Sequence, residues 1–275
     1  LTLIINYIYC KRKLKIKILL GKFQWGFIQE VAIYSFWIFI TAIMDRIYWS
    51  TGQFVLGAVA GTVVVSVYAV AIHLQSMYMQ FSTAISTVFL PKVTGMVALN
   101  DDRKAISDLF IRTGRIQNIV MSLILFGFIV FGQQFSDLWA GREYHGAYYM
   151  ALAFFVSLYV PLIQNLGITI LQARNQMTFR SILYIIIAIC ALGMEILFSK
   201  WWGGLGCALA IAGALFLGQG LIMNIYYHKK QHLDIISFWK EIVKMDIVPL
   251  VVSALFVVVL HYFDFVHSWL TLGIG

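Results

Sequence analysis

The sequence predicts an all-α protein, a polytopic transmembrane helical bundle with about seven spans and truncated ends. Hydrophobic residues make up 61% of the 275 residues and charged residues only 12%, with a mean hydropathy of +0.85. A soluble domain typically carries about 25% charged residues. Because a membrane-spanning helix needs roughly 20 apolar residues, the length allows seven or so spans. This composition argues against a soluble enzyme or a nucleic-acid-binding domain.

The spans are predicted from long stretches without Lys, Arg, Asp or Glu. An ionised side chain near the centre of a bilayer costs about 2.5 kcal/mol or more on insertion scales. Gly-rich segments around 50–62 and 199–204 suit tight reversals on one membrane side. Together these signals place helices at 28–49, 63–90, 116–137, 147–171, 181–198, 205–227 and 247–263, with a truncated helix from Trp269. The apolar runs at both ends are too short to span, so we expect a fragment truncated at both ends.

The basic residues alternate from loop to loop along the chain. The loops 10–24, 89–115, 172–181 and 228–246 hold 17 of the 20 Lys and Arg residues, and the opposite set of loops holds three. The positive-inside rule assigns the first set to the cytoplasm, and this topology explains the net charge of +8 without nucleic acid. Within them, 101–115 and 234–246 are amphipathic and are predicted to lie along the membrane surface, for lipid contact or for docking a partner enzyme.

Motifs for catalysis, cofactor binding or metal binding are absent from the sequence. GxxxxGK[ST], GxGxxG, HExxH, GxSxG and paired-cysteine patterns do not occur, and Cys10, Cys190 and Cys207 are scattered. We therefore predict no catalytic residue, no cofactor and no metal ion, and a protein that is not an enzyme.

Polar side chains inside the spans provide the candidate substrate pathway. Tyr68, Gln75 and Ser82 are seven residues apart in the 63–90 helix and share one stripe, and His73 is the one histidine inside a span and away from its ends. Polar groups in a bundle turn toward each other or toward a wet cavity. The stripe therefore lines a hydrated pathway or forms interhelix hydrogen bonds, and the sequence leaves both open.

A second group of candidates surrounds a proline. Pro161 lies in mid-span, where it removes a backbone hydrogen bond and kinks the helix, and it is predicted to act as a hinge or as a static bend. The amides of Gln164, Asn165 and Gln172 follow it. Asp45 and Arg46 are predicted to close the first complete helix, either as functional charges or as interface anchors.

Six segments resemble one family, the polysaccharide and oligosaccharide flippases of the multidrug/oligosaccharidyl-lipid/polysaccharide exporter superfamily. The resemblance is carried by Met44–Arg46, Ser66–Ala71, Phe89–Pro91, Leu138–Gly141 with Tyr144, Leu171–Asn175 and Gly203–Ala208. It implies a two-lobed bundle of twelve to fourteen helices with a MATE-like exporter fold. Residues 1–24 would be the end of a truncated helix and a basic cytoplasmic linker, and 25–275 the C-terminal lobe.

The resemblance also implies a function, which is the translocation of a lipid-linked oligosaccharide across the bacterial plasma membrane by alternating access. Arg46 and Arg174 would meet the pyrophosphate of the undecaprenyl carrier. The expected partners are the lipid bilayer, this lipid-linked oligosaccharide, the missing N-terminal lobe, and assembly proteins for capsule or lipopolysaccharide. The alternatives are a drug or cation antiporter of the same superfamily and a membrane glycan-processing enzyme.

Overall fold

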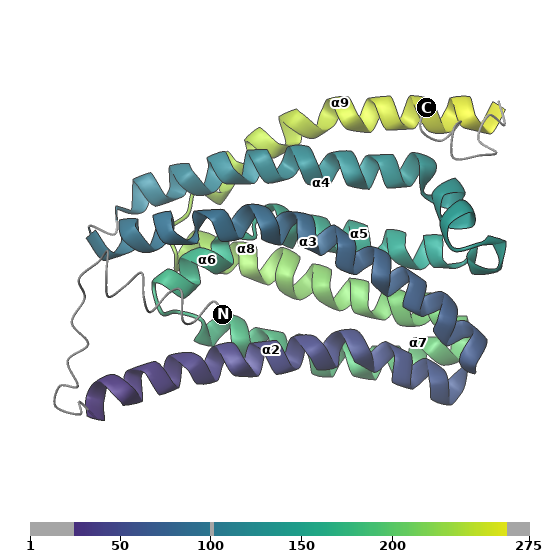
Figure 1. Cartoon of the computed structure of the whole chain (residues 1–275). Helices are drawn as coiled ribbons and strands as arrows, with labels where there is room; N and C mark the ends of the chain where they lie inside the picture. Colours follow the sequence, from purple (N-terminus) through teal and green to yellow (C-terminus); the bar gives the residue numbers. More distant parts are fainter. Residues whose placement is uncertain (1–24, 100–101, 263–275) are drawn as a thin grey trace, which may run out of the picture. The chain divides into compact units, whose positions relative to one another are not determined.

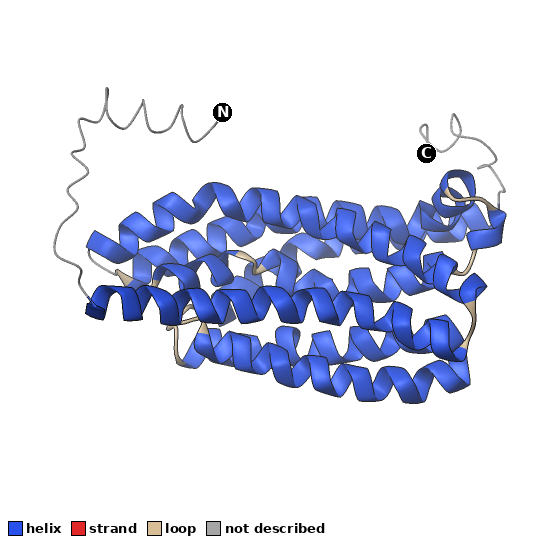
Figure 2. Cartoon of the chain, turned by 60° about the horizontal axis from the view of Figure 1, so that its bottom comes forward, coloured by secondary structure: helices blue, strands red, loops and turns tan. Residues whose placement is uncertain are grey.

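The computed structural model describes residues 25–99 and 102–262, and these are helical, with no strand among them (Figure 2). The predicted basic linker at 10–24 and the predicted helix from Trp269 lie outside the described residues. The chain divides into two compact units, 1–36 and 37–275. Of the first unit, the structure describes only the beginning of one helix. The architecture described below is that of the second unit.

The helices follow one another with short connections (Figure 1). In chain order they are α2 (Trp25–Val59), α3 (Thr62–Leu99), α4 (Arg103–Trp139), the 3-10 turn η1 (Arg142–Tyr144), α5 (Ala147–Ile163), α6 (Leu166–Ala173), α7 (Thr178–Leu215), the π-helical segment η2 (Phe216–Ile222), α8 (Met223–Lys229) and α9 (Ile235–Tyr262).

Several helices are longer than the sequence predicted. The predicted loop at 50–62 is wrong, because α2 continues to Val59 and only Ala60 and Gly61 separate it from α3. Asp45 and Arg46 therefore lie in the middle of α2 rather than at its end. The predicted loop 89–115 is also helical over most of its length, since α3 runs to Leu99 with Pro91 inside it.

The two predicted surface helices are not separate elements. Residues 103–115 and 116–137 form the single helix α4, and 235–246 and 247–262 form the single helix α9. Both helices begin at aspartate caps. The Asp102 carboxylate accepts hydrogen bonds from the backbone N–H groups of Lys104 and Ala105 at 3.0 and 3.3 Å. Hydrogen bonds from Ser237 hold the pKa of the Asp234 carboxyl below its ordinary value.

Helix α7 contains a reversal at Gly203. The backbone there has φ 55° and ψ −132°, which is not helical. Residues on either side meet as in an antiparallel pair, with Phe179 stacked on Tyr226 at 4.1 Å between ring centroids. A Cβ at Gly218 would overlap the side chain of Ile187. The predicted helices 181–198 and 205–227 are therefore present, but a single residue replaces the predicted loop 199–204.

The predicted fold class is confirmed. Among the described residues, four helices are long and apolar enough to cross a membrane, or five if the bent pair α5 and α6 is one span. One of the four, 178–229, doubles back at Gly203 and so accounts for two predicted spans. The predicted span 247–263 is the later part of α9, whose earlier part carries Lys240, Glu241 and Lys244.

The second unit is apolar outside and partly polar inside. Helix α5 packs against α3, α4 and α7, and α4 packs against α9. Large apolar side chains such as Phe54 and Leu123, which are 77% and 73% exposed, cover its outer faces. Tyr68, Gln75 and Ser82 are buried, which confirms that their stripe faces inward. Such a distribution suits a bundle surrounded by lipid.

Candidate functional site

A small polar cavity lies inside the second unit, among α2, α3, α5, α6, α7 and η2. Its volume is about 70 Å³, which is enough for a few water molecules and well below the 300–1,000 Å³ of a typical ligand pocket. Its polar lining residues are Asp45, Trp49, Thr83, Asn165, Arg180, Tyr184 and Gln219, and its apolar ones are Met79, Leu158, Pro161, Leu162, Ile168 and Leu215.

The carboxylate of Asp45 and the guanidinium of Arg180 line this cavity together. The Tyr184 hydroxyl donates a hydrogen bond to Oδ1 of Asp45 at 2.7 Å. The guanidinium of Arg180 lies over the ring of Tyr184, 5.7 Å from its centroid. The Nε of Arg180 is buried and has no hydrogen-bond partner among the described residues. A buried donor without a partner is costly, which makes this N–H beside the cavity a candidate contact for an acceptor.

A bend close to the predicted kink forms one wall of the cavity. Helix α5 continues through Pro161 to Ile163, and α5 and α6 are bent by 46° at the break over Gln164 and Asn165, on the C-terminal side of the proline rather than at the carbonyl that it frees, that of Ser157. The hydroxyl of Ser82 on α3 donates to the carbonyl of Leu162 at 2.7 Å, which ties α3 to the last turn before the break. The bend is therefore held by a side chain, and Asn165 at its apex lines the cavity.

A π-helical segment forms the opposite wall. Phe216–Ile222 contains an extra residue per turn, and Gln219 from its middle lines the cavity. Such segments occur frequently at functional sites because they re-aim a side chain. One turn later, Asn224 accepts hydrogen bonds from Gln164 Nε2 at 2.8 Å and from Trp239 Nε1 at 3.0 Å. These bonds join the bend and α9 to α8, which directly follows the π segment.

The other predicted pathway residues are spread over the unit. Ser82 and Gln164 hydrogen bond next to the bend, as described. Tyr68 packs against Gly52, where a Cβ would overlap its hydroxyl, and Gln75 donates to the sulfur of Met79. His73 is exposed and stacks on Trp139 at 5.9 Å between centroids.

Neither of the two arginines predicted to meet a pyrophosphate lines the cavity. Arg46 is exposed on α2, and Arg174 donates to the carbonyl and Oε1 of Gln231 at 3.1 and 3.0 Å, across the ends of two helices. Gln172 lies in the last turn of α6, half-buried. Of the predicted pathway and hinge residues, Asp45, Asn165 and Pro161 line the cavity.

Sequence reasoning missed Arg180 as a site residue. We counted it among the basic residues of the predicted loop 172–181, whereas it occupies the first turn of α7. Its long side chain extends along the helix to Tyr184, four residues later, which is the spacing at which helical side chains meet. An arginine four residues before a tyrosine at the start of an apolar run was the available signal. Gln219 was missed because a π segment has no simple sequence pattern.

The cavity brings charged and hydrogen-bonding side chains together in apolar surroundings. It combines a cation, a carboxylate, two hydroxyls, an indole and two amides, which suits hydrogen bonding to an anionic or hydroxylated group. Among the described residues, no group of three His, Cys, Asp or Glu side chains could hold a metal ion. The fold defines a multi-pass helical membrane protein, and this cavity lies among its helices.

The family follows from comparison with known proteins. Residues 1–149, more than half of the chain, match the family described as polysaccharide biosynthesis protein, and the chain belongs to this family. The flippase-type resemblance is therefore confirmed. Four of the six segments that carried it, from Met44 to Tyr144, lie inside the matched range. No curated protein and no solved structure matches the chain significantly.

Proposed function

We propose that this chain is the second lobe of a flippase that moves a lipid-linked oligosaccharide across the bacterial plasma membrane by alternating access. The observation that carries the proposal is the interior cavity in which Arg180 presents an unpartnered N–H beside Asp45 and Tyr184. Membership of the polysaccharide biosynthesis family supports it. The protein acts as a transporter and not as an enzyme, and its partners are the bilayer, the lipid-linked glycan, the N-terminal lobe and glycan assembly proteins.

Arg180 is the group that meets the phosphate of the carrier lipid. A guanidinium remains charged inside an apolar bundle and presents several donors in a fixed plane, which suits phosphate oxygens. Asn165 and Gln219 supply amides to sugar hydroxyls at the same cavity. Because the cavity is only about 70 Å³, the glycan enters in another conformation, and the bend at Pro161 and the π segment are the wall elements that would move.

The test replaces Arg180 in the full-length protein and measures glycan at the cell surface. We expect Arg180→Gln to reduce surface glycan about tenfold or more, because a charge-assisted contact to phosphate is lost. The matched control is Arg142→Gln, an exposed arginine of η1, which should leave export unchanged. Protein abundance in the membrane is measured for both. Normal export by Arg180→Gln at wild-type abundance would contradict the proposed role.

A drug or cation antiporter is the second candidate, and one observation favours it. Asp45 lies with the aromatic side chains of Trp49 and Tyr184 around the same cavity, and a carboxylate among rings suits an organic cation. In a deletion strain complemented with Asp45→Asn, loss of resistance to cationic drugs with normal surface polysaccharide would establish this function instead. Loss of surface glycan with normal resistance supports the flippase.

A further inference from the structure

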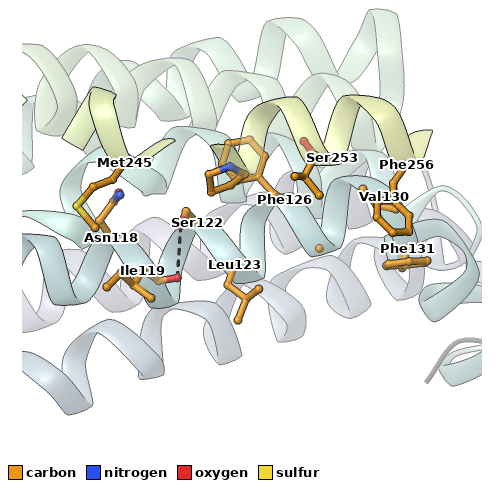
Figure 3. A pocket seen from close by; sticks show the side chains of 13 residues that line it. Asn118, Ile119, Ser122, Leu123, Phe126, Val130, Phe131, Met245, Ser253 and Phe256 are labelled. Atoms are coloured by element: carbon orange, nitrogen blue, oxygen red, sulfur yellow. Dashed lines mark hydrogen bonds between the residues drawn. The ribbon is translucent and has the colours of Figure 1, made fainter. Parts of the chain in front are cut away.

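An apolar groove of about 370 Å³ runs between α4 and α9, on the outside of the second unit (Figure 3). Its lining is formed by Asn118, Ile119, Ser122, Leu123, Phe126, Gly127, Val130 and Phe131 of α4 and by Met245, Pro249, Val252, Ser253 and Phe256 of α9. Small residues cause the hollow. Gly127 has open space where a Cβ would be, and Ser122 and Ser253 face the groove from the two helices.

One end of the groove is closed by a polar network. Asn118 donates to Oδ1 of Asp246 at 2.8 Å, and the hydroxyl of Tyr159 on α5 donates to Oδ2 of Asp246 at 2.7 Å. These bonds attach α9 to α4 and α5 at one level. Beyond that level the two helices remain apart far enough to leave the groove, whose remaining lining is apolar apart from the two serines.

Charged side chains of both signs lie near this same end, where Asp246 supplies one carboxylate. Arg115 is one turn before Asn118 on α4 and forms an ion pair with Glu241 at 3.7 Å, and Arg115 remains half-exposed. Lys244 is exposed on α9 one residue before the groove residue Met245, and it does not itself line the groove. The opposite end, formed by Val130, Phe131 and Phe256, carries no charged side chain. The groove is thus apolar along most of its length, and the basic side chains of Arg115 and Lys244 lie near its polar end together with the carboxylates of Glu241 and Asp246.

We propose that the α4–α9 groove binds an acyl chain of an anionic phospholipid, with the lipid phosphate at the Arg115 and Lys244 end. Leu123 is 73% exposed and Val252 is 46% exposed, so the groove opens to the surrounding bilayer and a chain can enter sideways. An acyl chain fills the apolar groove, whose surface water solvates unfavourably. Basic residues at the membrane surface attract anionic headgroups, and a zwitterionic headgroup carries no net charge for them.

The groove and the headgroup end are tested separately by native mass spectrometry of purified full-length protein. Phosphatidylglycerol and phosphatidylcholine with the same chains are titrated, and the retained lipid is counted. Val252→Trp should weaken phosphatidylglycerol binding about tenfold, because the indole occupies the space of several methylene groups. Its matched control is Val251→Trp, since Val251 is 49% exposed on the same helix but does not line the groove. The control should bind as the wild type does.

The charge is tested with two double variants of equal net charge. Arg115→Gln with Lys244→Gln should abolish the preference for phosphatidylglycerol over phosphatidylcholine, which we expect to be about tenfold from two cations. Arg142→Gln with Lys200→Gln, at exposed positions elsewhere, should retain it. The charge variants still test the proposal if the Val252→Trp variant does not fold.

Equal retention of the two lipids by the wild type, or equal loss in Val251→Trp and Val252→Trp, would overturn the proposal. Displacement of phosphatidylglycerol by an equimolar polyprenyl phosphate would overturn it too, and would assign the groove to a carrier lipid.

Discussion

At the scale of single residues, the interior is held by hydrogen bonds between short and amide side chains. Gln117 on α4 donates through Nε2 to the hydroxyls of Ser86 at 2.6 Å and Ser82 at 3.3 Å on α3. Ser82 in turn donates to the carbonyl of Leu162 on α5. One buried serine therefore connects three helices next to the bend.

Ser82→Ala should reduce the free energy of unfolding by about 1 kcal/mol, because interhelix hydrogen bonds in membrane bundles average about 0.6 kcal/mol and Ser82 makes more than one. The matched control is Ser76→Ala on the same helix, where the serine is exposed. That change should have an effect of less than about 0.3 kcal/mol. Reversible unfolding in mixed micelles measures both. Equal effects at the two positions would mean that the buried network does not contribute to stability.

The inward stripe was predictable from sequence, but the cavity was predictable only in part. Spacing of seven residues placed Tyr68, Gln75 and Ser82 on one face, and polarity placed that face inside, which is where they lie. Sequence rules assign arginine to the water, so Arg180 was counted with a loop. The reach of its three-methylene stem and guanidinium from the helix end to the cavity depends on where α7 begins, and charge counting does not determine that position.

At the scale of helices, three interruptions shape the second unit. They are the break after Pro161, the reversal at Gly203 and the π segment Phe216–Ile222. Two of them border the cavity, and Gly203 sets the antiparallel packing that brings the π segment opposite Tyr184. The position of each interruption is therefore tied to the site.

Gly203→Ala should destabilise the protein by about 1–3 kcal/mol, because φ 55° with ψ −132° is a conformation that residues with a Cβ rarely adopt. A Cβ at Gly203 meets no atom within 4 Å, so the cost is in the backbone alone. The control is Gly193→Ala in the same helix, which also has open space but a helical backbone. It should stabilise the protein by up to about 1 kcal/mol. The contrast is measured by equilibrium unfolding, and a Gly203→Ala variant as stable as Gly193→Ala would refute the reversal.

Helix positions were predictable, and helix ends were not. Charge-free stretches located the apolar centres correctly, because they report depth in the bilayer. They do not report secondary structure, and helices continue beyond the lipid. This is why α4 extends through the charged segment from Arg103 and why α3 extends past Lys92. Glycines near the end of α2 suggested a loop, but no proline follows to stop the helix before Ala60.

At the scale of the whole molecule, the turns of the second unit gather at two ends (Figure 1). At one end, a Cβ on Gly204 would contact Met150 and Val64, which places the Gly203 reversal beside the beginnings of α3 and α5. At the other end, Arg174 contacts Gln231, and Asp234 N–H donates to Ser107 at 2.9 Å. The second end carries most of the basic residues, in agreement with the alternation of charge along the sequence.

This two-ended arrangement predicts which residues an impermeant reagent reaches. In a variant whose natural cysteines are replaced by serine, Arg142→Cys and Lys200→Cys lie at one end, and Lys104→Cys and Lys230→Cys at the other; all four positions are exposed. By the positive-inside rule, a membrane-impermeant maleimide added to intact spheroplasts should label the first two and should label the second two only after lysis. Basic residues are retained on the cytoplasmic side, so the reverse pattern would invert the proposed orientation. Labelling of positions from both ends in intact spheroplasts would contradict the bundle itself, because helices that cross the bilayer must separate those ends.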